Sequence, residues 1–320
     1  MSHNEIQSQA RIIRIDAGND GQRIDNFLLV QLKGVPRSMV YRLLRTGQVR
    51  VNKRRCKPHY KLKYGDQVRI PPVRQREKTG TASPAADELE WLARQILYED
   101  KSMIIVNKPS GMAVHGGSGV SYGVIEAFRK LRPQEKFLEL VHRLDRDTSG
   151  CLVLARKRSA LVRLHEMLRR ENGGKIDKTY QLLVKGIWTG PKQKVQQPLL
   201  RNVRKSGERI VQVNEEGKPA STVFVPLKNY PADDAALIEA RLLTGRTHQA
   251  RVHAAYIGHP IAGDDKYGDR PFNRRLRQLG LKRLFLHASR LRFMHPDGGR
   301  LVDVTAPLPD ELGRVLDALS

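Results

Sequence analysis

The 320-residue sequence has only two cysteines, Cys56 and Cys151, and they lie far apart in the chain. Two such distant cysteines provide no disulfide framework and no zinc-ligand spacing. Cys151 lies within the apolar run 151–155, so we interpret it as a buried structural thiol. No apolar stretch reaches the length of a transmembrane helix, and the polar N-terminus carries no secretory signal. We therefore expect a soluble, cytoplasmic protein.

Signatures of nucleotide and metal cofactors are also missing. The chain has no GxxxxGKS or GxxxxGKT phosphate loop, no GxGxxG after a strand and no GxSxG nucleophile turn. The glycine-rich run 116–119 is too weak a signal to replace them. His248 and His253 could bind a metal in principle, but no cysteine, glutamate or third histidine completes a ligand set at a recognisable spacing. We expect no ATP, nicotinamide, other small-molecule cofactor or metal.

Acidic residues are scarce relative to basic ones. The chain has 58 Lys and Arg against 33 Asp and Glu, a formal net charge of +25. Such an excess raises the local concentration of polyanions and speeds association with phosphate backbones. A solubilising charged surface would explain a smaller excess, and an acidic membrane surface is a weaker alternative. We predict nucleic acid as the partner.

The basic residues concentrate towards the N-terminus, where the sequence predicts a small domain. Residues 1–72 carry 15 basic and 5 acidic residues. We expect an N-terminal extension over 1–20 and a first domain over 21–73. A linker is expected over 74–90, because small and breaker residues replace any apolar periodicity there. The second domain is expected over 91–320.

The first domain has the pattern of two helices followed by a basic hairpin. The second helix is predicted to begin near Ser38, as its N-cap, and to end at Gly47. Its apolar face includes Leu43 and Leu44. We expect basic side chains of this helix and of the segment 50–63 to form an RNA-binding surface, the alternative being a solvated charged surface. The candidate RNA-binding residues are Arg37, Arg42, Arg45, Arg50, Lys53, Arg54 and Arg55.

The second domain mixes short strands with helices in no regular order. Strands are expected over 103–107, 138–142, 180–185 and 235–243. Amphipathic helices are expected over 159–170 and from Thr247, as the cap, to about Gly258. This irregular order predicts an α+β fold on a mixed sheet, not a regular series of βαβ units.

The segment 142–150, HRLDRDTSG, is the strongest candidate for a reactive site. Apolar runs flank it, so two buried strands would hold one polar loop at the end of a sheet. The carboxylate of Asp145 would be kept ionised by Arg143 and Arg146. The alternative is a salt-bridged turn closed by Gly150, and composition alone slightly favours that alternative.

Two further segments bear on this choice. Tyr180 opens a strand, where its ring could stack on a base and its hydroxyl could share a proton, although a core tyrosine is more common. The segment 244–253, TGRTHQARVH, is a turn entering a helix. Its Arg246 and Arg251 lie near the helix N-terminus, which suits phosphate or carboxylate contact. A capped surface helix with solvated basic residues explains this segment about as well.

Together these segments resemble a known family. HRLDRDTSG, the KTY segment and TGRTHQARVH are similar to the three motif regions of RluA-type RNA pseudouridine synthases. NKPSGMAVHGG (107–117), GHPIAGDDKYGD (258–269) and FLHASRLRF (285–293) match further segments of that family in the expected order. The stretch 21–72 resembles an S4 RNA-binding domain. One departure is Ala250, where the family usually carries a larger aliphatic residue.

The resemblance implies an isomerase of RNA, with an S4 RNA-binding domain ahead of a mixed-sheet catalytic domain. It implies that Asp145 is the catalytic residue, that Tyr180 packs against the target base and that Arg251 pairs with the aspartate. It also implies that Arg143 fills the duplex after the target nucleotide leaves it. His142 and Arg246, from the same motifs, are further candidates for RNA contact.

The nearest likeness within the family is to enzymes that act on the large ribosomal subunit. The expected partner is therefore 23S ribosomal RNA, modified by a monomeric enzyme without a cofactor. Two other functions stay open. A non-enzymatic RNA-binding protein would use the S4 domain, but about 230 residues with three motif regions follow the linker. A nucleosidase or glycosidase could use Asp145 and Asp147 and would release free uracil, whereas isomerisation leaves the RNA mass unchanged.

Overall fold

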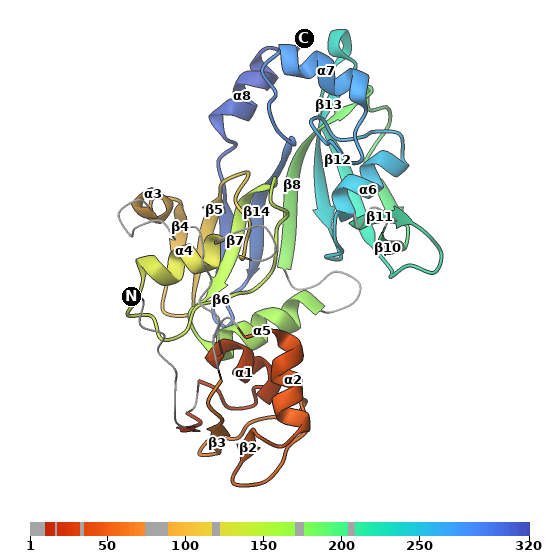
Figure 1. Cartoon of the computed structure of the whole chain (residues 1–320). Coiled ribbons are helices and arrows are strands. Elements are labelled where there is room, and N and C mark those ends of the chain that lie inside the picture. Colours follow the sequence, from red (N-terminus) through yellow and green to blue (C-terminus); the bar gives the residue numbers. More distant parts are fainter. Residues whose placement is uncertain are drawn as a thin grey trace, which may run out of the picture. The chain divides into compact units, whose positions relative to one another are not determined.

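The computed structural model describes residues 10–16, 18–32, 35–73, 89–116, 122–169, 176–203 and 209–320. The chain divides into two compact units, residues 1–83 and 84–320 (Figure 1). The predicted linker lies outside the described residues except for its last two positions. In the described segments, no helix is both long and apolar enough to span a membrane.

The first unit packs two helices against a three-stranded antiparallel sheet with the order β1-β3-β2. Leu28, Leu43 and Val68, one from each helix and one from the central strand, belong to its buried core. β1 falls within the segment predicted as an N-terminal extension, and it pairs with β3 along its whole length. The elements are β1 (Arg11–Arg14), α1 (Ile24–Gln31), α2 (Arg37–Arg45), β2 (Arg50–Val51) and β3 (Gln67–Ile70).

Helix α2 begins one position before the predicted N-cap. Its N-cap is Pro36, whose φ of −56° suits a chain entering a helix, and Ser38 lies exposed in the first turn without capping it. The apolar face is as predicted, because Leu43 and Leu44 are buried. Arg37, Arg42 and Arg45 are exposed.

The second unit is built on one ten-stranded mixed sheet with the order β4-β5-β7-β14-β8-β13-β12-β9, to which β6 and β15 are added on β7 and β14. A separate two-stranded ladder joins β10 to β11. The strands are β4 (Ile96–Glu99), β5 (Met103–Lys108), β6 (Glu139–Leu140), β7 (Ser149–Ala155), β8 (Ile176–Lys185), β9 (Gln193–Gln196), β10 (Leu199–Val203), β11 (Arg209–Val213), β12 (Ser221–Tyr230), β13 (Ala235–Leu242), β14 (Leu286–Met294) and β15 (Leu301–Thr305). The helices are α3 (Glu90–Ala93), α4 (Val124–Leu131), α5 (Arg158–Arg169), the 3-10 turn η2 (Pro231–Asp233), α6 (Gln249–Tyr256), α7 (Arg270–Gln278) and α8 (Asp310–Asp317).

The late strand β14 lies between β7 and β8 in the middle of this sheet (Figure 1). It pairs in parallel with β7 and antiparallel with β8, so the sheet is mixed and the predicted α+β class is confirmed. Gly150 allows β7 to approach β14, because a Cβ at this position would lie 2.2 Å from the carbonyl oxygen of Ala288. Its φ of +106° also favours glycine.

Three of the predicted elements have different ends in the structure. The strand expected over 138–142 has only two residues, because His142 Nε2 accepts the backbone N–H of Val153 at 3.2 Å and replaces the next ladder bond. The helix expected from Thr247 starts at Gln249, because its N-cap His248 has a left-handed backbone with φ 54°. The prediction that Tyr180 opens a strand was wrong, because β8 begins four residues earlier, at Ile176.

Candidate active site

A hollow of about 620 Å³ opens around Asp145 where three segments of the second unit meet. These are the loop before β7, the first half of β8 and the turn before α6, all three of which the sequence analysis selected. These segments are far apart in the sequence, but the sheet brings them close together, because only β14 lies between β7 and β8. The lining includes His142, Arg143, Leu144, Asp145, Lys178, Tyr180, Arg246, His248, Ala250, Arg251 and Leu286.

The loop that carries Asp145 is held through its backbone carbonyls. Lys108 is fully buried, and its Nζ donates to the carbonyl of Arg146 at 2.9 Å and to two carbonyls of the turn after β5. The hydroxyl of Ser110 donates to the carbonyl of Asp147 at 2.8 Å. The Asp145 side chain is therefore not needed to hold its own loop and is available to a substrate.

The cation beside Asp145 comes from α6 and not from the loop. Nη1 of Arg251 lies 3.5 Å from Oδ2 of Asp145, whose side chain is 19% exposed. Arg146, expected at this place, instead donates from Nε to the carbonyl of Gly111. Arg143, also expected there, is exposed and lines the hollow without a carboxylate partner among the described residues. Among the described residues neither loop arginine forms an ion pair with Asp145, so the prediction of direct pairing with them was wrong. The partner is Arg251, the residue that the family resemblance implied.

Arg251 is oriented by a second carboxylate, Asp264. Its Nε and Nη2 donate to the two oxygens of Asp264 at 2.7 and 2.8 Å, and the Asp264 side chain is fully buried. Burial disfavours the charged form of each side chain, but the two hydrogen bonds between them favour it more strongly. The pKa of Arg251 is therefore raised and the pKa of Asp264 is lowered. The pair stays ionised, and one guanidinium nitrogen is left to face Asp145.

His248 approaches Asp145 from the other side. Its Nε2 lies 3.8 Å from Oδ2 of Asp145, and its Nδ1 lies 2.8 Å from the hydroxyl of Tyr267. That hydroxyl accepts the backbone N–H of Val211 at 3.0 Å, which leaves its own hydrogen for Nδ1. Burial lowers the pKa of His248 and, together with the charge of Arg251, outweighs the opposing charge of Asp145, so the ring is neutral at pH 7. This arrangement favours the tautomer whose Nε2 hydrogen faces the carboxylate.

Tyr180 and Lys178 extend from β8 into the same hollow. Burial raises the pKa of Tyr180, with the charge of Asp145 adding to it, so the phenol stays protonated. Burial lowers the pKa of Lys178 to about 8. His142 also lines the hollow, but burial lowers its pKa to about 4 and its Nε2 is bonded to β7, so it is a neutral residue there.

Other candidate residues are placed as follows. Arg246 lines the hollow and donates from Nε to the carbonyl of Pro219. His253 uses both ring nitrogens, with Thr222 and with the carbonyl of Gln197, so they are engaged within the fold. The candidate RNA-binding residues of the first unit are all exposed: Arg37, Arg42, Arg45, Arg50, Lys53, Arg54 and Arg55.

Sequence reasoning did not single out Asp264 and Tyr267 and considered His248 only as a metal ligand. Asp264 and Tyr267 lie in GHPIAGDDKYGD, which the resemblance covered without assigning roles. A buried aspartate has no distinctive sequence pattern, because its partner Arg251 lies thirteen positions away.

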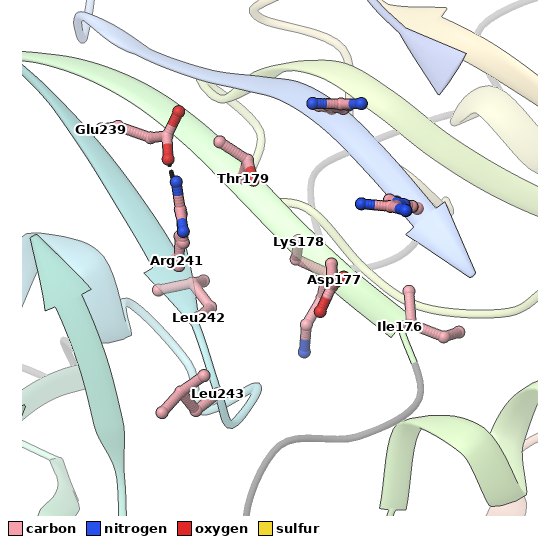
Figure 2. A pocket seen from close by; sticks show the side chains of 10 residues that line it. Ile176, Asp177, Lys178, Thr179, Glu239, Arg241, Leu242 and Leu243 are labelled. Carbon is pink, nitrogen blue, oxygen red and sulfur yellow. Dashed lines mark hydrogen bonds and ion pairs between the residues drawn. The ribbon is translucent and has the colours of Figure 1, made fainter. Parts of the chain in front are cut away.

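The sheet has a second, smaller hollow of about 250 Å³ near the start of β8 (Figure 2). Arg241 and Glu239 of β13 form an ion pair of 2.7 Å there, and Thr179 of β8 lies opposite Arg241 in the ladder. Side chains alternate along a strand, so Thr179 and Tyr180 extend to opposite faces of the sheet. The two hollows share Lys178, Leu242 and Leu243, but the ion pair of this one lies on the face of the sheet opposite to Tyr180.

Comparison with known proteins identifies the family. Residues 102–256 match the RNA pseudouridylate synthase family and residues 22–68 match the S4 domain. The chain is 56% identical over 312 residues to ribosomal large subunit pseudouridine synthase C of Escherichia coli O157:H7, covering 97% of this chain and 96% of that protein. It is 53% identical to the protein of the same name from Pasteurella multocida, covering 98% and 95%. The chain belongs to the RNA pseudouridylate synthase family.

Solved structures of this family share the fold. Human RNA Pseudouridylate Synthase Domain Containing 4 matches with a TM-score of 0.60 and 25% identity, covering 73% of this chain and 97% of that chain. Human RNA Pseudouridylate Synthase Domain Containing 1 matches with a TM-score of 0.58 and 26% identity, covering 71% and 87%. The protein is thus a pseudouridine synthase with an N-terminal S4 domain, as the sequence predicted.

Proposed function

We propose that this pseudouridine synthase isomerises specific uridines of 23S ribosomal RNA in the large subunit, with Asp145 as the catalytic residue. The substrate class is supported by the names of the relatives that match nearly the whole chain. The observation that carries the assignment of Asp145 is its place in the hollow, 3.5 Å from the oriented guanidinium of Arg251 and beside Tyr180.

The reaction needs only groups that the protein itself supplies. The C1′–N1 bond of the uridine breaks, the uracil turns, and C5 joins C1′; N1 ends with a proton and C5 loses one, so the RNA keeps its mass. An ionised carboxylate can serve as a nucleophile towards the sugar or the base, or remove the C2′ proton. No electron is gained or lost and no outside group is transferred, so we propose that the enzyme acts without a cofactor.

The neighbours of Asp145 have distinct proposed roles. Tyr180, protonated and buried, packs against the uracil, and Arg251 orients the carboxylate. The target base must leave its stack, which costs a few kcal/mol. Arg143, exposed at the rim of the hollow, occupies the space that the base vacates. His142 shapes the wall of the hollow, and Arg246 contacts RNA.

The S4 domain, residues 21–73, is proposed to hold the RNA, and residues 91–320 to carry the chemistry. Arg37, Arg42 and Arg45 extend from one exposed face of α2, and the remaining cations follow on the β2–β3 segment. A surface of this kind neutralises backbone phosphates without reading sequence. We further propose a monomer working in the bacterial cytoplasm, where ribosomal RNA is made and assembled.

Mapping pseudouridine in ribosomal RNA tests the substrate and Asp145 together. Cells lacking the gene should lose specific 23S pseudouridines, which the wild-type gene restores and an Asp145→Asn gene does not. Asparagine keeps the shape and removes the charge, so the variant should still bind RNA within a few-fold of wild type. An unchanged map would contradict the substrate, appreciable turnover by Asp145→Asn would contradict the catalytic role, and release of free uracil would show hydrolysis.

The proposed RNA-binding surface has its own test in the full-length protein. The triple variant Arg37→Gln, Arg42→Gln, Arg45→Gln should bind RNA more weakly, and its plot of log Kd against log salt should flatten by about 0.7 for each phosphate that the variant no longer neutralises. The control neutralises Arg241, Arg290 and Arg292, which line the hollow of Figure 2. Equal slopes for the two triple variants would show that α2 faces solvent and not RNA.

A further inference from the structure

Asp145 lies at the boundary between two hollows. The first, of about 620 Å³, has the largely apolar wall of Leu144, Tyr180 and Leu286. The second, of about 480 Å³, also reaches Asp145 and Arg251 but continues to the turn after α6 and to the residues around α7. We call the second one the basic hollow; it is lined by Arg143, Asp145, Arg146, Asp147, His248, Arg251, Gly263, Asp264, Asp265, Lys266, Arg277, Leu281, Lys282, Arg283 and Leu284.

The basic hollow carries an excess of positive charge, with seven Lys or Arg against four Asp in its lining. Two of the four acids are already engaged by arginines: Asp264 is held by Arg251 and Asp265 lies 3.2 Å from Arg277. Within the described part of the chain, Lys282 has no carboxylate at ion-pair distance, and its side chain is exposed. The first hollow also has cations, but its wall of Leu144, Tyr180 and Leu286 suits a base, whereas the basic hollow lacks such a wall and offers Lys282 to an anion.

The chemistry of a nucleotide matches this division. The glycosidic bond leaves the ribose at C1′, whereas the phosphodiesters leave it from the other end of the ring, at the 3′ and 5′ oxygens. A uridine that brings its C1′ to Asp145 with its uracil against Tyr180 can direct a neighbouring phosphodiester into the basic hollow, which also reaches Asp145. Arg277 and Lys282 are both exposed, and among the residues that the structure describes Arg277 pairs only with Asp265, whose side chain is 86% exposed. A surface ion pair of this kind is weak, so a phosphate can replace Asp265 as the partner of Arg277.

We propose that the basic hollow is a binding site for one phosphodiester of the RNA strand next to the target uridine, held by Arg277 and Lys282. This inference rests on the proposed function, because it places C1′ at Asp145. The site fixes the ribose from the side opposite the base, so that rotation of the cleaved uracil takes place against a sugar that does not move.

RNAs in which one phosphodiester is replaced by an uncharged linkage test the site directly. A short RNA with one target uridine is made in versions that carry one methylphosphonate at each linkage from two positions before the uridine to two positions after it. For the wild-type enzyme, one linkage adjacent to the uridine should raise Kd about tenfold, the size expected for one charge-assisted contact. For the double variant Arg277→Gln, Lys282→Gln, the same linkage should raise Kd by no more than about twofold.

The matched control is the double variant Arg290→Gln, Arg292→Gln, which removes the same charge from the hollow of Figure 2. It should keep the full penalty at the sensitive linkage. Thermal unfolding of all three proteins shows whether each is folded. A penalty of equal size in the wild type and the Arg277, Lys282 variant, or a wild type that no neutral linkage affects, would overturn the proposal.

Product formation in the same samples separates the two proposals. If the wild-type enzyme forms pseudouridine but no linkage is sensitive, the phosphodiester site is wrong and the proposed function stands. If it forms no pseudouridine in any ribosomal RNA substrate, the proposed function itself fails. Binding is read as Kd and conversion as pseudouridine, so neither outcome can be mistaken for the other.

Discussion

Arg251 gives two of its nitrogens to Asp264 and turns the third towards Asp145. The bonds to Asp264 measure 2.7 and 2.8 Å, and the distance from Nη1 to Asp145 is 3.5 Å. Asp264 itself is fixed by the backbone N–H groups of Lys266 and Tyr267. The direction of the cation at the proposed catalytic carboxylate is therefore set by a buried residue that need not touch the substrate.

Asp264→Asn should lower both stability and turnover. Removing one charge of a buried pair leaves the other without compensation, which typically costs about 3–5 kcal/mol. The reoriented Arg251 should lower kcat more than it changes KM. Urea unfolding and steady-state kinetics measure the two effects, with Asp265→Asn as the control because that side chain is 86% exposed. A destabilised Asp264→Asn enzyme with wild-type kcat would show that Asp264 acts only in folding.

Substitutions of Arg251 itself should separate charge from geometry. Arg251→Met removes the cation and should reduce single-turnover rates by about 100-fold or more, since electrostatic groups of this kind contribute on that scale. Arg251→Lys keeps the charge but cannot bond both oxygens of Asp264 and face Asp145 at once. We expect its rate to lie between those of the wild type and the methionine variant. Identical rates for the two variants would mean that the positive charge at position 251 is not what matters.

Arg143→Ala should impair extraction of the base more than its rearrangement. Loss of a side chain that fills the vacated stack raises the cost of the flipped state, and an RNA whose target uridine is already unpaired avoids much of that cost. In single-turnover assays the deficit should shrink by about tenfold on the opened RNA if roughly 1.4 kcal/mol of the loss is extraction.

The control for Arg143 is Arg146→Ala, from the same loop. Arg146 bonds the carbonyl of Gly111 and so holds the loop. Its deficit should be the same on structured and opened RNA. If Arg143→Ala behaved in this way too, its role would be in the chemical step or in holding the loop.

The stability of the second unit should fall on mild acidification because of His287. Its side chain is fully buried, its Nδ1 lies 2.9 Å from the hydroxyl of Ser149, and burial lowers its pKa to about 4. The unfolded chain takes up a proton near pH 6.5 and the folded protein does not, so the stabilisation is complete above pH 6.5 and is lost as the pH falls towards 4. Between pH 6.5 and 5 this one group should account for about 1.6 kcal/mol.

Fluorescence-detected urea unfolding can measure this loss, because both tryptophans, Trp91 and Trp188, lie in the second unit. His287→Gln should show a smaller loss between pH 6.5 and 5 than the wild type. His115→Gln, at an exposed position, should show the same loss as the wild type. An unchanged pH dependence in His287→Gln would mean that this histidine is protonated in the folded protein.

The sequence predicted the position of Asp145 well, because a polar loop between apolar strands is a local pattern. It also predicted the apolar face of α2 and the strand β13, which depend on periodicity along one element. Local sequence patterns did not predict which arginine would lie beside Asp145, and only the family resemblance pointed to Arg251. The loop arginines are nearer in sequence, but the direction of each side chain depends on backbone turns, and Arg251 is brought in by α6 from 106 positions away.

The helix start at Gln249 shows a second limit. Thr247 has good capping chemistry, and a threonine at that position reasonably predicts a cap. In the folded protein, the side chain of Gln249 accepts from the hydroxyl of Thr244 and from the backbone N–H of Arg246, and His248 takes up a left-handed backbone instead. That strained residue directs its ring at Asp145, so a local rule fails where tertiary contacts impose a conformation.

The place of β14 bears on when the enzyme can begin to work. β7 follows the Asp145 loop and β8 holds Tyr180, and these two strands do not pair with each other. Both pair with β14, residues 286–294, which lies between them. A nascent chain that ends before residue 286 can form the individual hairpins but cannot bring aspartate and tyrosine to one hollow. A ribosome making this enzyme must therefore translate almost nine-tenths of the message before the product can modify RNA.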